Sequence, residues 1–87
     1  MAWEDISYVL RSKTRKSVLA KLERAKTPTI LAKELHTSIP NISRALRELQ
    51  SRSLIESLTP DARVGKIFQA TQKGREVLQK AKEIEGQ

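Results

Sequence analysis

Polar side chains that can form paired hydrogen bonds recur on one face of a helix predicted over residues about 38–52. The same segment carries an apolar stripe at helical spacing, which marks its buried side and consists of Ile42, Ala45, Leu46 and Leu49. The side opposite that stripe carries Asn41, Ser43, Arg44, Arg47 and Ser51. Asparagine can bond N6 and N7 of adenine, and arginine can bond O6 and N7 of guanine. The pattern therefore indicates a surface able to read bases, with an ordinary solvated helix face as the alternative.

The charge of the whole chain points to the same class of partner. Its 87 residues include 17 lysines and arginines against 10 acidic residues, which gives a net charge of +7. Such an excess favours a polyanion, namely DNA, RNA or an anionic membrane surface, with a generically basic soluble protein as the alternative. Basic residues are concentrated over residues 11–26, where Glu23 is the one acid. A basic block beside helical sequence is typical of a surface that contacts phosphates.

Composition argues against several other classes of function. The chain has no cysteine, so disulfides, thiolate metal sites and cysteine nucleophiles are excluded. No stretch approaches the ~20 apolar residues of a membrane span, and the N-terminus lacks a signal-peptide pattern, which predicts a cytoplasmic protein. The sequence offers no paired carboxylates, nucleophile–base pair or glycine-rich phosphate loop, and its one histidine, His36, has no second metal ligand of matching type. We therefore expect no enzyme activity, no cofactor and no metal site.

Three short helices are predicted ahead of residue 38 from apolar residues at helical spacing. The first covers about two turns and contains Trp3, Ile6 and Val9 or Leu10. The second follows Ser12, which can cap it, and has a stripe of Val18, Leu19, Leu22 and Ala25. The third begins at Thr27–Pro28, a capping hydroxyl followed by a proline that needs no N–H, and it carries Ile30, Leu31, Ala32 and Leu35.

The pattern changes to that of a β-hairpin after residue 53. Two short runs, 54–59 and 66–70, contain β-branched or aromatic residues and flank the turn-rich segment 60–65. Thr71 can then cap a last helix with a stripe of Val77, Leu78, Ala81 and Ile84. After the short first element the order is thus helix, helix, turn, helix, hairpin, helix. Two helices joined by a short turn and followed by a hairpin are typical of a helix-turn-helix with a wing.

In this order the segments resemble winged helix-turn-helix regulators of the arsenic-repressor-like and multiple-antibiotic-resistance-regulator-like superfamily, above all its small single-domain archaeal members. The resemblance is carried by YVLRSKTRKSVLAKL, ILAKEL, NISRALREL, LIESLTPDARVGKIF and TQKGREVL, and it covers nearly the whole chain. It implies that residues 1–87 form one DNA-binding domain. The implied fold is mainly α, with a three-helix core, a two- to three-stranded wing and a C-terminal helix.

The resemblance also assigns roles to the polar residues. It implies that the helix at about 38–52 enters the major groove, which makes base-reading candidates of Asn41, Ser43, Arg44 and Arg47. The wing at about 55–70 would contact the flanking groove or the DNA backbone through Arg63 and Lys66, with a solvated loop as the alternative. We expect phosphate contacts from Lys13, Arg15, Lys16, Ser38 and Ser51, although the lysines and arginine of the helix start could also be merely solvated.

The partners follow from the same resemblance. We expect double-stranded DNA, a second copy of the chain and no membrane, in the cytoplasm and nucleoid of a prokaryotic cell. Pairing would place two reading helices in successive major grooves, and the amphipathic segments 3–10 and 77–84 are available for it. The alternative is a winged helix that contacts protein or RNA, because a fold does not settle a function. A protein interface would require an apolar anchor on the polar face, which the sequence does not provide.

Two positions depart from the pattern of these regulators. Glycine usually stands where this chain has His36, because the turn requires a left-handed backbone, and we expect His36 to adopt that conformation with some strain. Glycine is also usual at Ser53, just before the wing. The cysteine-rich metal-sensing motif of the arsenic-repressor branch is absent, so the resemblance does not extend to metal sensing.

Overall fold

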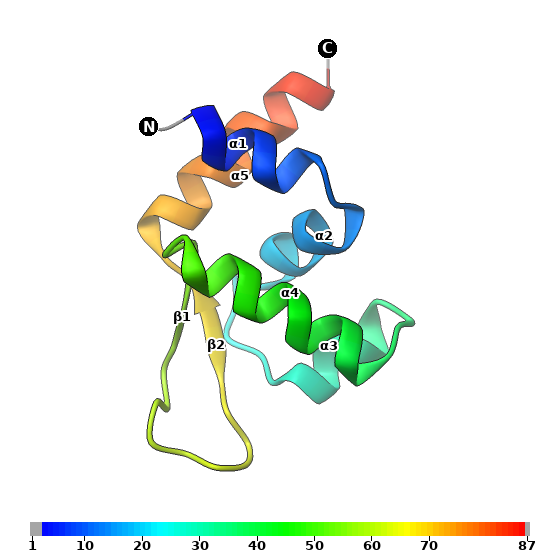
Figure 1. The fold of residues 1–87 in the computed structure, drawn as a ribbon, viewed down its shortest axis with the longest axis vertical. Coiled ribbons are helices and arrows are strands. Elements are labelled where there is room, and N and C mark those ends of the chain that lie inside the picture. The colour runs from blue at the N-terminus through cyan, green and yellow to red at the C-terminus, as the bar shows by residue number, and fades with distance from the viewer. Residues whose placement is uncertain (1–2, 87) are drawn as a thin grey trace.

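Five helices and one antiparallel pair of strands make up the computed structural model, which describes residues 3–86 (Figure 1). In chain order they are α1 (Trp3–Leu10), α2 (Lys13–Lys21), α3 (Pro28–Glu34), α4 (Ile39–Ser51), β1 (Ile55–Ser57), β2 (Phe68–Ala70) and α5 (Gln72–Glu85). This order confirms the predicted mainly α architecture with a small hairpin wing. The hairpin projects from one end of the molecule, and α1 and α5 lie at the other (Figure 1). None of the described helices is long and apolar enough to cross a membrane.

Four helices begin where the sequence provides a capping hydroxyl. Ser12, Thr27, Ser38 and Thr71 have extended backbones, and each side-chain oxygen accepts a hydrogen bond from the backbone N–H three residues ahead, at 3.0–3.3 Å. Proline occupies the first turn of both α3 and α4, where its missing N–H removes no helical bond. Local signals thus set the starts of these helices, including that of the polar-faced α4.

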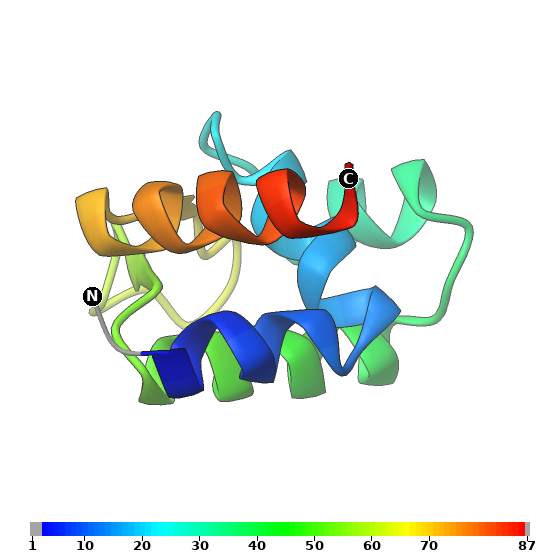
Figure 2. The same cartoon turned by 90° about the horizontal axis from the view of Figure 1, so that it is seen from above.

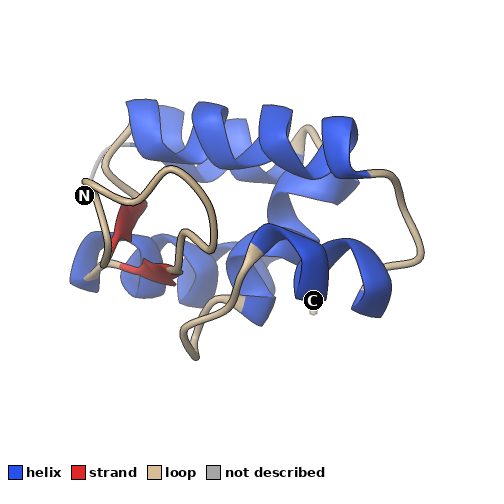
Figure 3. Cartoon of the chain, turned by 90° about the horizontal axis from the view of Figure 1, so that it is seen from below, coloured by secondary structure: helices blue, strands red, loops and turns tan. Residues whose placement is uncertain are grey.

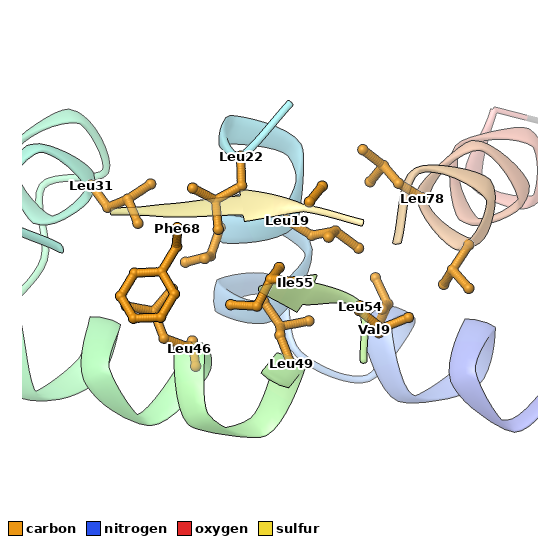
Figure 4. Packing of buried hydrophobic residues seen from close by; sticks show 14 of the residues in the cluster. Val9, Leu19, Leu22, Leu31, Leu46, Leu49, Leu54, Ile55, Phe68 and Leu78 are labelled. Atoms are coloured by element: carbon orange, nitrogen blue, oxygen red, sulfur yellow. The ribbon is translucent and has the colours of Figure 1, made fainter. Parts of the chain in front are cut away.

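A single apolar core joins the five helices to the hairpin (Figure 4). Helix α4 buries the whole stripe predicted from its spacing, and each of those side chains is at most 4% exposed. The same core contains buried side chains from α2, the hairpin and α5, including Leu19, Phe68 and Leu78 (Figure 4). Burial of apolar surface stabilises a fold by roughly 25 cal/mol per Å². Because one side of α4 is held in the core, its opposite side is fixed toward solvent.

The second helix is shorter than its apolar stripe predicted. Helix α2 ends at Lys21, and Ala25, the last residue of the predicted stripe, is exposed. The chain turns after the helix so that Lys26 pairs with Phe68, through N–H···O bonds of 3.0 and 2.9 Å. This pairing adds a third extended segment beside β2. A tertiary contact with a residue 42 positions later therefore overrides the local helical spacing.

Three more residues of the predicted apolar spacings are exposed, and the first of them is Trp3 of α1, at 63%. Ile30 is 44% exposed, because the short α3 buries only Leu31 and Ala32. Ile84 is 41% exposed and follows Ala81, the last buried residue of α5, by nearly one turn. In α3 and α5 the central residues of the predicted stripe are buried, and one predicted residue of each helix, Ile30 or Ile84, is exposed.

The hairpin has short strands and a long loop, as Figure 3 shows from the end where it projects. Ile55 lies opposite Ala70, and Ser57 lies opposite Phe68. Beyond the strands, the Leu58 N–H donates to the Ile67 carbonyl at 2.7 Å and the Ile67 N–H donates to the Thr59 hydroxyl at 3.0 Å. The strands thus cover less than the predicted runs 54–59 and 66–70.

The turn between α3 and α4 has the left-handed backbone expected at His36. The φ angle of His36 is +54°, and the next N–H, that of Thr37, closes the turn on the Ala32 carbonyl at 3.0 Å. Ser53, the other position where glycine is usual, has a φ of +60°. Both side chains are exposed, so buried contacts do not offset the strain of a left-handed L-residue.

We expect His36→Gly to raise the free energy of unfolding by up to about 1 kcal/mol, or to leave it unchanged. Glycine removes the steric cost of positive φ, and the larger entropy of its unfolded chain offsets part of that gain. Thermal unfolding followed by circular dichroism measures the change. The matched control is Lys33→Gly on the exposed side of α3, which should cost about 1 kcal/mol. A fall in midpoint for His36→Gly as large as that of the control would contradict this account of the turn.

Candidate nucleic-acid interface

The exposed side of α4 presents the polar residues that its periodicity predicted. Asn41, Arg44 and Arg47 are exposed and Ser43 is half-buried. The Asn41 side-chain amide donates to the Thr37 hydroxyl at 3.1 Å, which holds it near the turn before the helix. These side chains therefore lie on one helix face with their hydrogen-bonding groups accessible.

A polar groove runs along one edge of this face, between α4 and the start of α2. It measures about 270 Å³, and α4 contributes Asn41, Arg44, Ala45 and Glu48 to its lining. The opposite wall comes from Ser12, Thr14 and Arg15. Asn41, Arg44 and Glu48 are spaced three and four residues apart, so they follow one another along a single edge of the helix.

A second groove lies along the other edge, between α4 and the wing. It measures about 260 Å³ and brings Arg47 and Ser43 of α4 together with Lys66 and Phe68 of the hairpin. Arg63 lies in the exposed loop of the same hairpin, three residues before Lys66. The structure thus gathers the base-reading candidates and one of the two wing candidates around α4.

The cations of this face have no acidic partners. Among the described residues no carboxylate lies within ion-pair distance of Lys13, Arg44, Arg47, Arg63 or Lys66, and the same is true of Arg11, Arg24, Lys33 and Arg75. The lysines of α5 are instead paired with carboxylates, over 3.2–3.9 Å, at Lys73, Lys80 and Lys82. An unpaired cation keeps its attraction for an external anion. The unpaired cations of α4 and of the wing are therefore available to attract an anionic partner.

The phosphate candidates divide into two groups. Lys13 is exposed and lines a groove of about 280 Å³ with His36 and Thr37, beside the turn that leads into α4. Ser38 caps α4, while the Ser51 hydroxyl donates to the Glu48 carbonyl at 2.7 Å, and both residues are exposed. These three residues lie on α4 or beside its beginning.

Arg15 and Lys16 have intramolecular partners instead. The Arg15 Nε donates to the Tyr8 carbonyl at 2.9 Å, its Nη1 donates to Glu48 Oε1 at 3.3 Å, and its side chain is only 13% exposed. Lys16 forms an ion pair with Glu85 at the end of α5, away from α4. Arg15 thus lies in the wall of the groove beside α4 with its charge paired to Glu48, whereas Lys16 is paired at the far end of α5.

Asp5 is a buried carboxylate that the sequence reading missed. Its Oδ1 accepts from Arg52 Nη1 at 3.2 Å, and its Oδ2 lies 3.2 Å from Lys73 Nζ. Burial raises the pKa of Asp5, but hydrogen bonds from Arg52 and Lys73 and their charges outweigh it, so the pKa falls below its usual value. The carboxylate stays charged at neutral pH and ties α1 to the end of α4 and the start of α5. No local signal marks this site, because Asp5 and Arg52 are 47 residues apart.

The chain matches a known protein family, and its fold is similar to solved structures. A family model described as the HVO_A0261 N-terminal domain matches residues 3–87. No curated protein matches the chain.

The fold is similar to several solved structures of bacterial proteins. A mutant MarR from E. coli complexed with operator DNA has a TM-score of 0.78 at 24% identity and covers 97% of this chain. The adhesin competence repressor AdcR of Streptococcus pyogenes has a TM-score of 0.72 at 24% identity, over 86% of this chain. ZitR of Lactococcus lactis has a TM-score of 0.68 at 32% identity, over 86%. This chain spans 62%, 57% and 51% of their respective lengths, and the likeness shows a winged-helix fold.

Proposed function

The chain belongs to the HVO_A0261 N-terminal domain family, and on this premise we propose that residues 1–87 form one domain that binds double-stranded DNA sequence-specifically and regulates transcription. The observation that carries this proposal is the exposed side of α4, where Arg44 and Arg47 have no described acidic partner. A MarR structure with a similar fold was solved with operator DNA, which supports the same function here.

In this proposal α4 lies in the major groove, whose width of about 12 Å admits a helix. Arg44 and Arg47 bond guanine, Asn41 bonds adenine after releasing Thr37, and Ser43 contacts a base or a phosphate. The wing residues Arg63 and Lys66 contact the flanking groove or the backbone, where a narrow minor groove favours arginine.

Phosphate contacts in this proposal come from Lys13, Ser38 and Ser51, which lie on α4 or beside its start. Arg15 and Lys16 remain phosphate candidates in this proposal, and each would have to exchange its intramolecular partner, Glu48 or Glu85, for a phosphate.

Selection of bound sites from a pool of random duplexes tests the function. We expect one enriched sequence, with two half-sites 10–10.5 base pairs apart if two copies bind together. Recovery of no preferred duplex, combined with tight binding to RNA or to a protein, would favour the alternative of a winged helix that contacts those partners.

Affinity for DNA is expected to fall steeply with salt. Each neutralised phosphate contributes a slope of roughly −0.9 in log affinity against log salt, so about five contacts per subunit give about −4.5. Titrations of a labelled duplex at salt concentrations between about 50 and 200 mM give the slope. Lys66→Ala should reduce its magnitude by about 0.9, whereas the control Lys80→Ala, on α5 and paired with Glu83, should leave it unchanged. A wild-type slope near zero would refute binding through this basic face.

We also propose that the chain pairs with a second copy through α1 and α5. The two helices lie side by side at the end away from the wing (Figures 1 and 2), and Trp3 is 63% exposed there. We expect a dimer by sedimentation at tens of micromolar, and a shift toward monomer in Trp3→Glu because a charge in an apolar interface is costly. Val64→Glu, on the wing where Val64 is 86% exposed, should remain dimeric. A wild-type monomer, both free and on DNA, would contradict pairing.

A further inference from the structure

The ring of Tyr8 contacts two guanidinium groups at once. The Cζ atoms of Arg15 and Arg52 lie 3.8 and 4.0 Å from the ring centroid, within the range of a cation–π interaction. Tyr8 also holds Arg15 through its backbone, because its carbonyl accepts a hydrogen bond from Arg15 Nε at 2.9 Å, whereas the ring provides the contact to Arg52. Two cations held beside one ring repel each other, and the negative faces of the ring offset that repulsion.

Both guanidinium groups are fixed again by carboxylates. Arg15 donates to Glu48 of α4, and Arg52, which caps the end of α4, donates to Asp5 of α1. Asp5 and Tyr8 are three residues apart on α1, and Glu48 and Arg52 are four residues apart at the end of α4. The two residues of each pair therefore lie on the same side of their helix. We call Asp5, Tyr8, Arg15, Glu48 and Arg52 the Tyr8 cluster.

The Tyr8 cluster connects α1 with α4, although the two helices pack chiefly on other elements. Helix α1 packs mainly on α5 and α2, and it lies on the same side of the molecule as α4 (Figure 2). Glu48 also lines the groove that contains Asn41 and Arg44. Glu48 of the Tyr8 cluster therefore lies on the same edge of α4 as Asn41 and Arg44, two of the base-reading candidates.

We propose that Tyr8 is a positioning residue that, through Arg15 and Arg52, fixes the angle of α4 and so sets the selectivity of the domain among DNA sequences. This inference rests on the proposed function. Paired hydrogen bonds to a base edge require a defined helix position. Phosphate contacts carry no base identity, and flexible lysine side chains can follow a small displacement of the helix. Loosening α4 therefore weakens binding to the preferred site more than binding to other duplexes.

The test compares Tyr8→Leu with Tyr8→Phe on the selected duplex and on a scrambled duplex of the same composition and salt. Neither substitution changes the net charge. We expect Tyr8→Leu to bind the selected duplex at least about tenfold more weakly and the scrambled duplex less than threefold more weakly. Tyr8→Phe keeps the ring and should stay within twofold of wild type on both. Equal losses on the two duplexes for Tyr8→Leu, or a loss of selectivity in Tyr8→Phe, would overturn the proposal.

Arg52→Lys keeps the test decisive if Tyr8→Leu does not fold. Lysine preserves the charge beside Asp5 but lacks the planar group that stacks on a ring, so selectivity should fall about threefold to tenfold. Wild-type selectivity in Arg52→Lys, with thermal unfolding unchanged, would count against the cluster. Failure of the proposed function looks different, because the wild-type chain itself would then show no preference between the two duplexes.

Discussion

Gly74→Ala should lower the free energy of unfolding by at least about 3 kcal/mol, the upper range for overpacking a core. Gly74 lies in the first turn of α5, and a Cβ atom built there would stand 1.9 Å from the Leu54 carbonyl oxygen and 3.3 Å from Leu19 Cδ1. The same oxygen accepts the Thr71 N–H at 3.0 Å. Because the obstacle is backbone that is already hydrogen-bonded, the clash cannot be relieved by rotating a side chain.

The loss should be large on the scale of the whole domain. A chain of 87 residues has a stability of roughly 4–13 kcal/mol at about 0.05–0.15 kcal/mol per residue. At about 4–8 °C per kcal/mol for a domain of this size, 3 kcal/mol lowers the thermal midpoint by at least about 12 °C.

Gly65→Ala provides the matched control for Gly74→Ala. Gly65 has a φ of +68° and nothing within 4 Å of its added Cβ, so alanine there should cost only the strain of positive φ, about 1 kcal/mol. Thermal unfolding of both variants separates steric overlap from backbone strain. A midpoint for Gly74→Ala no lower than that of Gly65→Ala would show that α5 does not press on the carbonyl of Leu54.

Gly74 also illustrates what the sequence could not reveal. It stands in TQKGREVL, one of the segments that carried the family resemblance, yet nothing in its neighbours indicates why a glycine is there. A side chain is excluded at this position by the Leu54 carbonyl, which belongs to a residue 20 positions earlier in the chain. By contrast the cap at Thr71, three residues before Gly74, was predictable because its partner is the nearby Gly74 N–H.

The same distinction applies to the candidate interface. The polar face of α4 followed from periodicity alone, because the buried stripe fixes which side faces solvent. The left-handed turn at His36 followed from the family pattern. The ion pairs of Arg15 and Lys16 could not be predicted, because their partners Glu48 and Glu85 are 33 and 69 residues away. In a basic segment the sequence shows which residues are cations but not which cations are already paired.

Arg44→Ala and Arg47→Ala are expected to have the largest effects on DNA binding while leaving the fold intact. Both side chains are exposed and have no described ion-pair partner, so thermal unfolding should change by no more than about 0.5 kcal/mol, as at other surface positions. Each arginine that bonds a guanine in a bidentate manner contributes about 1–3 kcal/mol of discrimination. Affinity for the selected duplex should therefore fall about 5- to 150-fold for each variant.

The two arginines should also fail in different ways on altered sites. Arg44 lies on the edge of α4 near α2, and Arg47 lies on the edge near the wing. Each alanine variant should therefore tolerate any base at one position, and the two positions should differ. Repeating the site selection with each variant identifies the relaxed position directly.

Lys13→Ala is the matched control for Arg44→Ala and Arg47→Ala, because it also removes one unpaired cation beside the start of α4. A phosphate contact carries no base identity, so this variant should weaken binding to the selected and scrambled duplexes by the same factor. Equal losses on both duplexes for the arginine variants would mean that Arg44 and Arg47 only hold the DNA backbone. Unchanged binding for both, with folding intact, would mean that α4 does not lie in the groove and that the wing or another surface binds the DNA.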